Sequence, residues 1–158
     1  MKSKELENMI FNPIYTSLII HHFLSGVQSI NKNGIKTELI FIVLPIIYNQ
    51  ELSNKLSNLN INSKFTPLIE NKEYESFFSQ INSKINEYKT TTKHSLIILS
   101  SNNNLKINEY INIENSLDYK NEEDLFIKNI FKSAYNLGIL FAKERYFTII
   151  KKLRIHEL

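Results

Sequence analysis

"TELIFIVLPIIYNQ", residues 37–50, is the most apolar stretch of this chain, and its conformation decides the fold class. Residues 39–47 carry no charged or polar side chain, and a proline, Pro45, lies inside the run. The run is about half as long as a helix that spans a bilayer, so it does not predict a membrane segment. Its content of isoleucine, valine and phenylalanine favours a strand by propensity alone.

Pro45 argues against a strand. In a central strand it would remove a hydrogen bond of the ladder, and an edge strand this apolar would invite aggregation. A helix can hold Pro45 if the helix kinks there, or if a second helix starts there with the proline in its first turn. We prefer a buried helix that starts near residue 37, kinks near residues 44–45 and runs to about residue 57.

An apolar helix precedes this stretch. Asn12 is a good N-cap residue, and Pro13 suits the first helical position, where no needed hydrogen bond is lost. Apolar residues then recur at helical spacing until residues 31–34 end the helix. After the apolar run, residues 58–72 are rich in Asn and Ser and predict a loop with a short helical turn near residues 65–69.

The C-terminal part of the chain also predicts helix. Asn121 can cap a helix over residues 121–144, and three acidic residues in its first turn suit the helix dipole. Ala134 and Gly138 are small and four residues apart, so they share a face and let another helix approach closely. A last short helix over residues 145–155 closes the chain.

Residues 73–114 predict a smaller unit. An amphipathic helix over residues 73–87, a break at residues 89–91 and a second helix to residue 99 come first. Alternating apolar residues then predict a β-hairpin with its turn near residues 108–109. Helix, short turn, helix and hairpin is the order of elements in a winged-helix unit.

Together these elements predict a mainly α fold: a single compact helical domain with a winged-helix-like unit and one small β-hairpin. The 158 residues fit one domain of ordinary size. We expect a helical core over residues 12–57 and 121–155, with the winged-helix-like unit over about 73–114.

Composition limits the classes of function. The net charge is +3, which is too small to imply nucleic-acid binding by itself. The absence of cysteine excludes disulfides, thiolate metal sites and cysteine nucleophiles. The N-terminal residues alternate in charge and lack the apolar segment of a signal peptide. We therefore expect a soluble protein of the cytoplasm.

The sequence offers little for catalysis. Its three glycines do not form a phosphate-binding loop. His21 and His22 are adjacent on a helix, so they lack the spacing of four residues that a zinc helix uses. Residues 122–124 are acidic, but their position at a helix start favours solvent-facing charges over a metal site. No serine has the context of a nucleophile elbow, so we predict that the protein is not an enzyme and holds no cofactor or metal.

Two features could carry binding, and the first is the hairpin with the helix before it. The cations there are Lys93, His94 and Lys106, and Glu109 and Glu114 oppose them. A DNA-reading winged helix needs several Arg or Lys residues to reach phosphates and bases. This set is therefore poor for DNA and favours a unit used for packing or protein contacts.

The second feature is the C-terminal stretch, which interleaves cations with aromatic and aliphatic residues. Its cations could lie in solvent around a closing helix whose apolar face completes the core. It could equally be a basic, aromatic surface for an acidic protein or a nucleic-acid backbone. The partner-binding candidates are Lys143, Arg145, Tyr146, Phe147, Lys151, Lys152 and Arg154.

The order of four motifs resembles a known family. The motifs are "NPIYTSLIIHHFLSGVQ", "ELIFIVLPIIYNQELSNKL", "TTTKHSLIIL" and "AYNLGILFAKERYFTIIKKLRI". In this order they resemble the middle component of bacterial ABC-three-component systems, of which Lamassu-type antiphage operons carry an example (LmuC-like). The resemblance covers about residues 12–155. It includes Leu44 and Pro45 in an apolar run and Leu137 and Gly138 near the end.

This resemblance implies a non-catalytic adaptor subunit. Such a subunit links an SMC-like coiled-coil ABC ATPase to an effector, commonly a nuclease, so that recognition of foreign DNA by the ATPase activates the effector. Contact of the subunit with DNA would then be indirect or weak, and no membrane would be involved. The alternative is a winged-helix DNA-binding protein or regulator, which the order of elements at residues 73–114 and the basic C-terminal stretch would suit.

Overall fold

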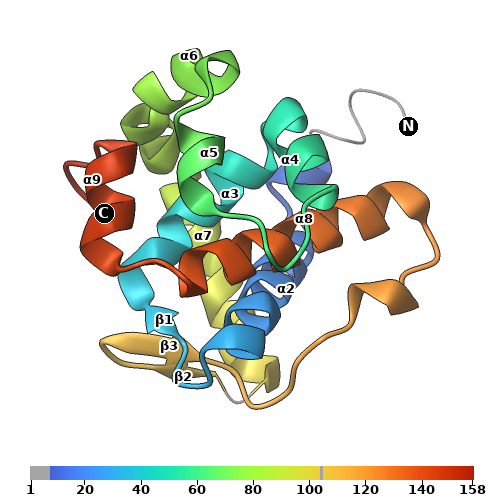
Figure 1. Cartoon of the computed structure of the whole chain (residues 1–158). Helices are drawn as coiled ribbons and strands as arrows, with labels where there is room; N and C mark the ends of the chain where they lie inside the picture. Colours follow the sequence, from blue (N-terminus) through green and yellow to red (C-terminus); the bar gives the residue numbers. More distant parts are fainter. Residues whose placement is uncertain (1–7, 104) are drawn as a thin grey trace.

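A computed structural model describes residues 8–103 and 105–158 of the chain. The elements in chain order are α2 (Pro13–Ile30), β1 (Ile35–Lys36), η1 (Thr37–Ile42), α3 (Val43–Ile47), α4 (Gln50–Ser57), α5 (Phe65–Ile69), η2 (Lys72–Tyr74), α6 (Glu75–Ser79), α7 (Ile81–Asn103), β2 (Lys106–Ile107), β3 (Tyr110–Asn112), η3 (Tyr119–Asn121), α8 (Leu125–Ala142) and α9 (Tyr146–Leu153). Figure 1 shows the helices packed around a common centre, with the small sheet at one end. The predicted mainly α, single-domain fold is confirmed.

Helices α2 and α8 lie side by side at the centre of the fold (Figure 1). They meet at two glycines, Gly26 on α2 and Gly138 on α8. A Cβ added to Gly138 would overlap the carbonyl oxygen of Phe23 and lie 2.8 Å from the amide nitrogen of Val27. A Cβ added to Gly26 would overlap the carbonyl oxygen of Tyr135. The close helix approach predicted at Gly138 is therefore confirmed, and the approaching helix is α2.

Two local predictions in the first half of the chain hold as stated. The Asn12 side chain accepts a hydrogen bond from the amide of Ile14 at 2.9 Å, and Pro13 is the first residue of α2. The short helical turn predicted in the loop after α4 is α5, with the predicted bounds. Both features depend on residues close in sequence, which is why local chemistry predicts them.

The apolar run is helical and almost entirely buried, as predicted, but it is not one kinked helix. It forms η1 and then α3, and α4 starts anew after Tyr48 and Asn49. Pro45 is the third residue of α3, where its missing amide deprives the helix of no hydrogen bond. The break falls at Asn49 because its side chain caps α4, accepting from the amide of Leu52 at 2.9 Å.

The break predicted at residues 89–91 is wrong, because α7 passes through it without interruption. Thr91, which resembles a cap residue in the sequence, is buried inside the helix, and so is Ser95. The Ser95 hydroxyl donates to the carbonyl of Thr91 one turn earlier, at 2.8 Å, and is hydrogen-bonded to the hydroxyl of Thr16 on α2. Hydroxyls that bond the preceding turn are tolerated inside a helix, so Ser95 joins two helices and does not end one.

The chain breaks instead at Gln80, between α6 and α7. Helix, turn, helix and hairpin still follow one another over residues 73–114, with the turn displaced towards the N-terminal end. The winged-helix-like description of this segment stays a prediction.

The predicted hairpin is confirmed, and a third strand extends it. Strands β2 and β3 are antiparallel, with Ile107 opposite Ile111. On its other side β3 pairs with β1, which was not predicted, and Ile35 is opposite Ile111. Two residues are too few to display an alternating pattern. Gly34, at φ +84°, supplies the left-handed turn before β1 and allows close contact with the backbone of Ile111.

The cap predicted for α8 is displaced by one turn. Asn121 ends the short helix η3, and α8 begins after Asp124. The Asp124 carboxylate accepts a hydrogen bond from the amide of Ile127 at 2.9 Å. Asp and Asn are comparable N-caps, so the sequence around residues 121–124 offers two equivalent starts. The start at Asp124 leaves two of the three acidic residues outside the helix.

This displacement is testable by comparing two caps. We expect Asp124→Ala to lower the free energy of unfolding by about 1 kcal/mol, because the amide of Ile127 loses its acceptor. Asn121→Ala serves as the matched control and is expected to change it by less than about 0.5 kcal/mol. Urea denaturation measures both. If Asn121→Ala lowers the free energy of unfolding more than Asp124→Ala does, the helix starts at Asn121, as the sequence predicts.

Candidate protein-interaction surface

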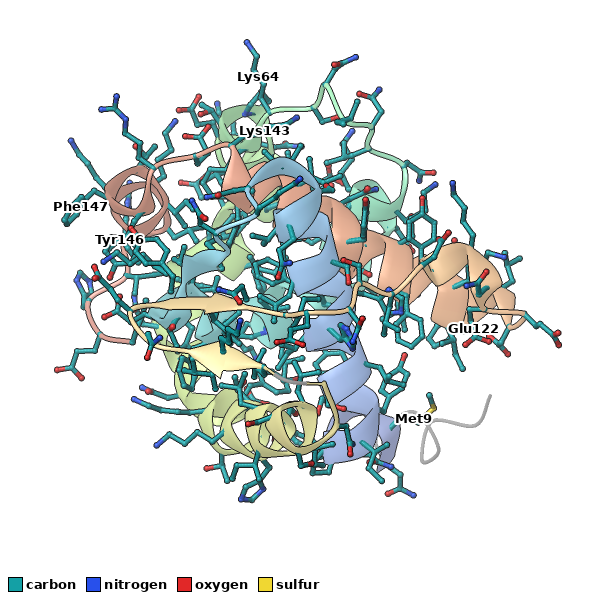
Figure 2. The ribbon with its side chains drawn as sticks, turned by 90° about the horizontal axis from the view of Figure 1, so that it is seen from below. Met9, Lys64, Glu122, Lys143, Tyr146 and Phe147 are labelled. Carbon is teal, nitrogen blue, oxygen red and sulfur yellow. The ribbon has the colours of Figure 1, made fainter. Side chains whose placement is uncertain are left out.

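The C-terminal helix α9 is amphipathic and lies on the surface of the domain. Ile149 and Leu153 point into the core and are buried. Phe147 points the other way, and Figure 2 shows its ring projecting from the molecule beside Tyr146. Its side chain is 81% exposed, which makes Phe147 the most exposed large hydrophobic residue in the described part of the chain. Aromatic residues are enriched at protein–protein contacts, so Phe147 is a candidate contact residue.

Tyr146 behaves differently from its neighbour. It is partly buried and packs against the core. Burial raises the pKa of the Tyr146 phenol, and a hydrogen bond to the Glu38 carboxylate adds to that rise. The Lys36 ammonium lies 5.8 Å from the centre of the Tyr146 ring. Of the two predicted aromatic anchors, Tyr146 thus joins α9 to η1, and Phe147 is free to contact a partner.

Two of the predicted cations make contacts within the domain. The Lys143 ammonium donates to the carbonyl oxygens of Ile61 and Ser63, which holds the loop before α5 against the end of α8. The Lys152 ammonium donates to the hydroxyl of Thr66 at 2.6 Å. Lys152 also lies 3.5 Å from the carboxylate of Glu70. These two lysines therefore stabilise the packing of α5 and its flanking loop against the C-terminal part of the chain.

The other three cations are exposed. Arg145, Lys151 and Arg154 form no ion pair within residues 8–103 and 105–158. Arg154 follows the last residue of α9 in the left-handed conformation, at φ 52°. The amide of Ile155 then donates to the carbonyl of Ile150 at 3.1 Å, which closes the helix end. Glycine is the usual residue at such a position, and another residue there costs about 1 kcal/mol.

Lys151, Lys152 and Arg154 line one groove, which we call the basic groove. It lies between α9 and the α5–α6 segment, which are neighbours in Figure 1, and has a volume of about 780 Å³. Its lining comprises Ile69, Glu70, Asn71, Lys72, Glu75, Phe78, Ser79, Thr148, Lys151, Lys152, Leu153 and Arg154. Sequence reasoning found the α9 wall but missed Lys72 and Glu75. No local signal could have found them, because only packing brings residues 69–79 beside α9.

His21 and His22 on α2 are buried, and within the described residues they belong to no group of side chains that could hold a metal ion. His21 donates from Nε2 to the carbonyl of Asn115 at 2.6 Å. His22 stacks on Phe131, with ring centres 4.3 Å apart. Burial and, to a lesser extent, the neighbouring His21 lower the pKa of His22 to about 4, against the opposing charges of Asp118 and Glu122. No group of three His, Asp or Glu residues in the described ranges is placed to hold a metal ion.

Two cations of the hairpin region form ion pairs with acids. Lys106 lies 3.6 Å from the carboxylate of Glu114, and Lys36 on β1 forms an ion pair with Glu109 in the hairpin turn. Lys93 and His94 are exposed on α7. Paired cations attract phosphates weakly, so Lys93 and His94 are the cations of this region that remain for a nucleic acid, which is fewer than a DNA-reading surface needs.

Comparison with known proteins identifies one family. The model of the family described as ABC-three component (ABC-3C) system Middle Component 3 matches residues 2–157. Neither the search of curated proteins nor the search of solved structures finds a match. No helix in the described part of the chain has both the length and the apolarity needed to cross a membrane.

Proposed function

The chain belongs to the ABC-three component (ABC-3C) system Middle Component 3 family, and on this basis we propose that it is a non-catalytic adaptor between the other components of such a system. The proposed partners are an SMC-like coiled-coil ABC ATPase and an effector, commonly a nuclease, in a Lamassu-type antiphage complex of the cytoplasm. The observation that carries the proposal is a family match over nearly the whole chain, residues 2–157.

The surface of α9 supports an adaptor role. Phe147 is an exposed aromatic residue, and Arg145 and Lys151 are exposed cations on the same helix or its cap. Aromatic residues and arginine are the residue types that contribute most to protein–protein binding. The proposal that the subunit is not an enzyme rests on the sequence, which places no nucleophile beside a base. No feature of the described residues favours winged-helix DNA binding over the adaptor role.

Co-expression tests the adaptor proposal. The tagged chain is produced together with the proteins of its two flanking genes and purified through the tag. We expect both proteins to be retained, and we expect them to separate from each other when this chain is omitted. If those two proteins purify together without this chain, and the chain retains neither of them, the adaptor function is wrong.

A single substitution on α9 separates binding from folding. We expect Phe147→Ala to reduce partner retention about tenfold, as the loss of an exposed aromatic anchor does, while the thermal midpoint stays unchanged. Tyr146→Ala is expected to lower the thermal midpoint, because Tyr146 packs against the core. Ile97, which is 66% exposed on α7, provides the control variant Ile97→Ala. Equal retention by the Phe147 and Ile97 variants would remove Phe147 from the interface.

A further inference from the structure

The basic groove combines an apolar base with three cations that form no ion pair within the described residues. Phe78 and Leu153 are 8% and 1% exposed and lie among the lining residues, next to Ile69. Four cations line the groove, Lys72, Lys151, Lys152 and Arg154, against two carboxylates, Glu70 and Glu75. Within the described residues, the only ion pair among these groups joins Lys152 to Glu70 at 3.5 Å. Lys72, Lys151 and Arg154 are thus left to attract a negative charge from outside.

We propose that the basic groove binds an acidic, amphipathic segment of a partner protein. The carboxylates of that segment lie against Lys72, Lys151 and Arg154, and an apolar side chain lies against Ile69, the partly buried apolar residue of the lining. The inference rests on the proposed function, because the segment belongs to another component of the same complex. It goes further in assigning the binding site and the chemistry of the bound segment.

The two walls of the groove suit a bound chain. Lys72 comes from η2, and Lys151 comes from α9 on the opposite side. A segment lying between them meets a cation on each side and an apolar surface below. Opposite charges arranged in this way speed association and fix orientation, and the buried apolar contact adds affinity.

Arg154 supplies a further argument from its backbone. Its left-handed conformation suits glycine better than arginine, so the backbone of the helix end does not by itself favour an arginine here. Its side chain is exposed and lines the groove, where it adds the third unpaired cation. A residue that strains its backbone while presenting its charge to a groove is typical of a binding site.

The chemistry of the groove favours a protein segment over a nucleic acid. Glu70 and Glu75 lie in the same lining as the cations and would repel phosphate groups. Phe78, the aromatic residue of the lining, is buried and exposes no ring face on which a base could stack. A peptide can turn its carboxylates towards the lysines and its amides towards the glutamates, which a phosphate backbone cannot do.

Zero-length cross-linking of the purified complex tests the contact directly. A carbodiimide joins a lysine amine to a carboxylate that touches it, and mass spectrometry identifies the joined peptides. We expect Lys72 and Lys151 to be linked to Asp or Glu residues within one short segment of a single partner. Links from these lysines only to scattered carboxylates, or only within this chain, would overturn the proposal.

Charge reversal tests the energetic role of the groove. The variant K72E/K151E/R154E is expected to lose at least tenfold in partner retention at about physiological salt. The control variant K32E/K55E/K93E makes the same change in net charge at three exposed lysines outside the groove, and we expect it to retain the partner. Equal retention by both variants, with wild-type retention intact, would overturn the groove while leaving the adaptor function in place. Failure of the wild-type chain to retain any partner would instead overturn the adaptor function itself.

Arg154→Gly separates the binding role from a structural one. Glycine relaxes the left-handed residue, so we expect the thermal midpoint to rise by about 2 °C while partner retention falls. A lower midpoint with unchanged retention would make Arg154 a structural residue and count against the proposal. Purification is repeated after nuclease treatment, and loss of the partner in that arm would show a nucleic acid in the groove and overturn the proposal.

Discussion

Gly138→Ala is expected to destabilise the protein by about 3 kcal/mol or more, the largest effect of any substitution considered. The new methyl group would occupy the position of the Phe23 carbonyl oxygen and crowd the amide of Val27. Neither atom can rotate away, because both belong to the backbone of α2. The two central helices must therefore separate, which weakens the packing on both sides of the crossing. The same reasoning applies to Gly26→Ala, whose methyl group would meet the backbone of Tyr135.

Thermal unfolding measures the effect. A loss of this size lowers the midpoint by about 10 °C in a domain of this length. Asn129→Ala is the matched control, since it replaces an exposed residue of α8 and tests helix propensity without a helix–helix contact. We expect that control to be neutral or slightly stabilising. If Gly138→Ala is as stable as the control, α2 and α8 do not meet at these glycines.

Acid is expected to destabilise the protein through His22, by about 2 kcal/mol between pH 6.5 and pH 4. The pKa of His22 is lowered to about 4 in the folded protein, mainly because burial disfavours the charged ring. In the unfolded chain the ring takes up a proton near its usual pKa of about 6.5. Between these values the unfolded state binds more protons than the folded state, so stability falls as the pH falls. The contribution of His22 is complete above pH 6.5 and lost once the pH drops below about 4.

His22→Phe isolates this contribution. A phenyl ring can keep the stacking on Phe131 and removes a buried nitrogen, Nδ1, that has no hydrogen-bond partner in the structure. We expect the variant to lose less stability than the wild type between pH 7.5 and pH 4.5, as measured by urea denaturation at each pH. His94→Gln, at an exposed position of α7, is the control. Parallel stability–pH curves for the wild type and His22→Phe would contradict the burial of His22.

Features that depend on neighbouring residues were predictable from the sequence. The cap at Asn12, the short helix α5, the hairpin and the last helix each have their signal within a few residues, so local hydrogen bonding and periodicity identify them. The close approach at Gly138 was also predictable, since a small residue on an apolar helix face leaves room for another backbone. The identity of the approaching helix was not predictable, because no residue near Gly138 in the sequence indicates a contact with Phe23.

The errors share one physical cause. The break placed at residues 89–91 overlooked that Thr91 can lie buried inside a helix, where its carbonyl accepts from the Ser95 hydroxyl. The cap placed at Asn121 was one of two equivalent local choices, and the kink placed at Pro45 assumed a longer helix than the chain forms. In each case the local preferences were nearly balanced, so the residues around each position did not decide between the alternatives.

The candidate surface likewise has one part that the sequence predicts and another that only the tertiary structure shows. Composition and spacing alone identified a basic, aromatic C-terminal helix, and its exposed Phe147 follows from the position of the apolar face, which repeats along α9. The groove depends on Lys72 and Phe78, which lie more than 60 residues from Arg154 in the sequence and reach it only through packing. Side-chain periodicity reports which face of a helix is buried, but only tertiary contacts determine what lies opposite it.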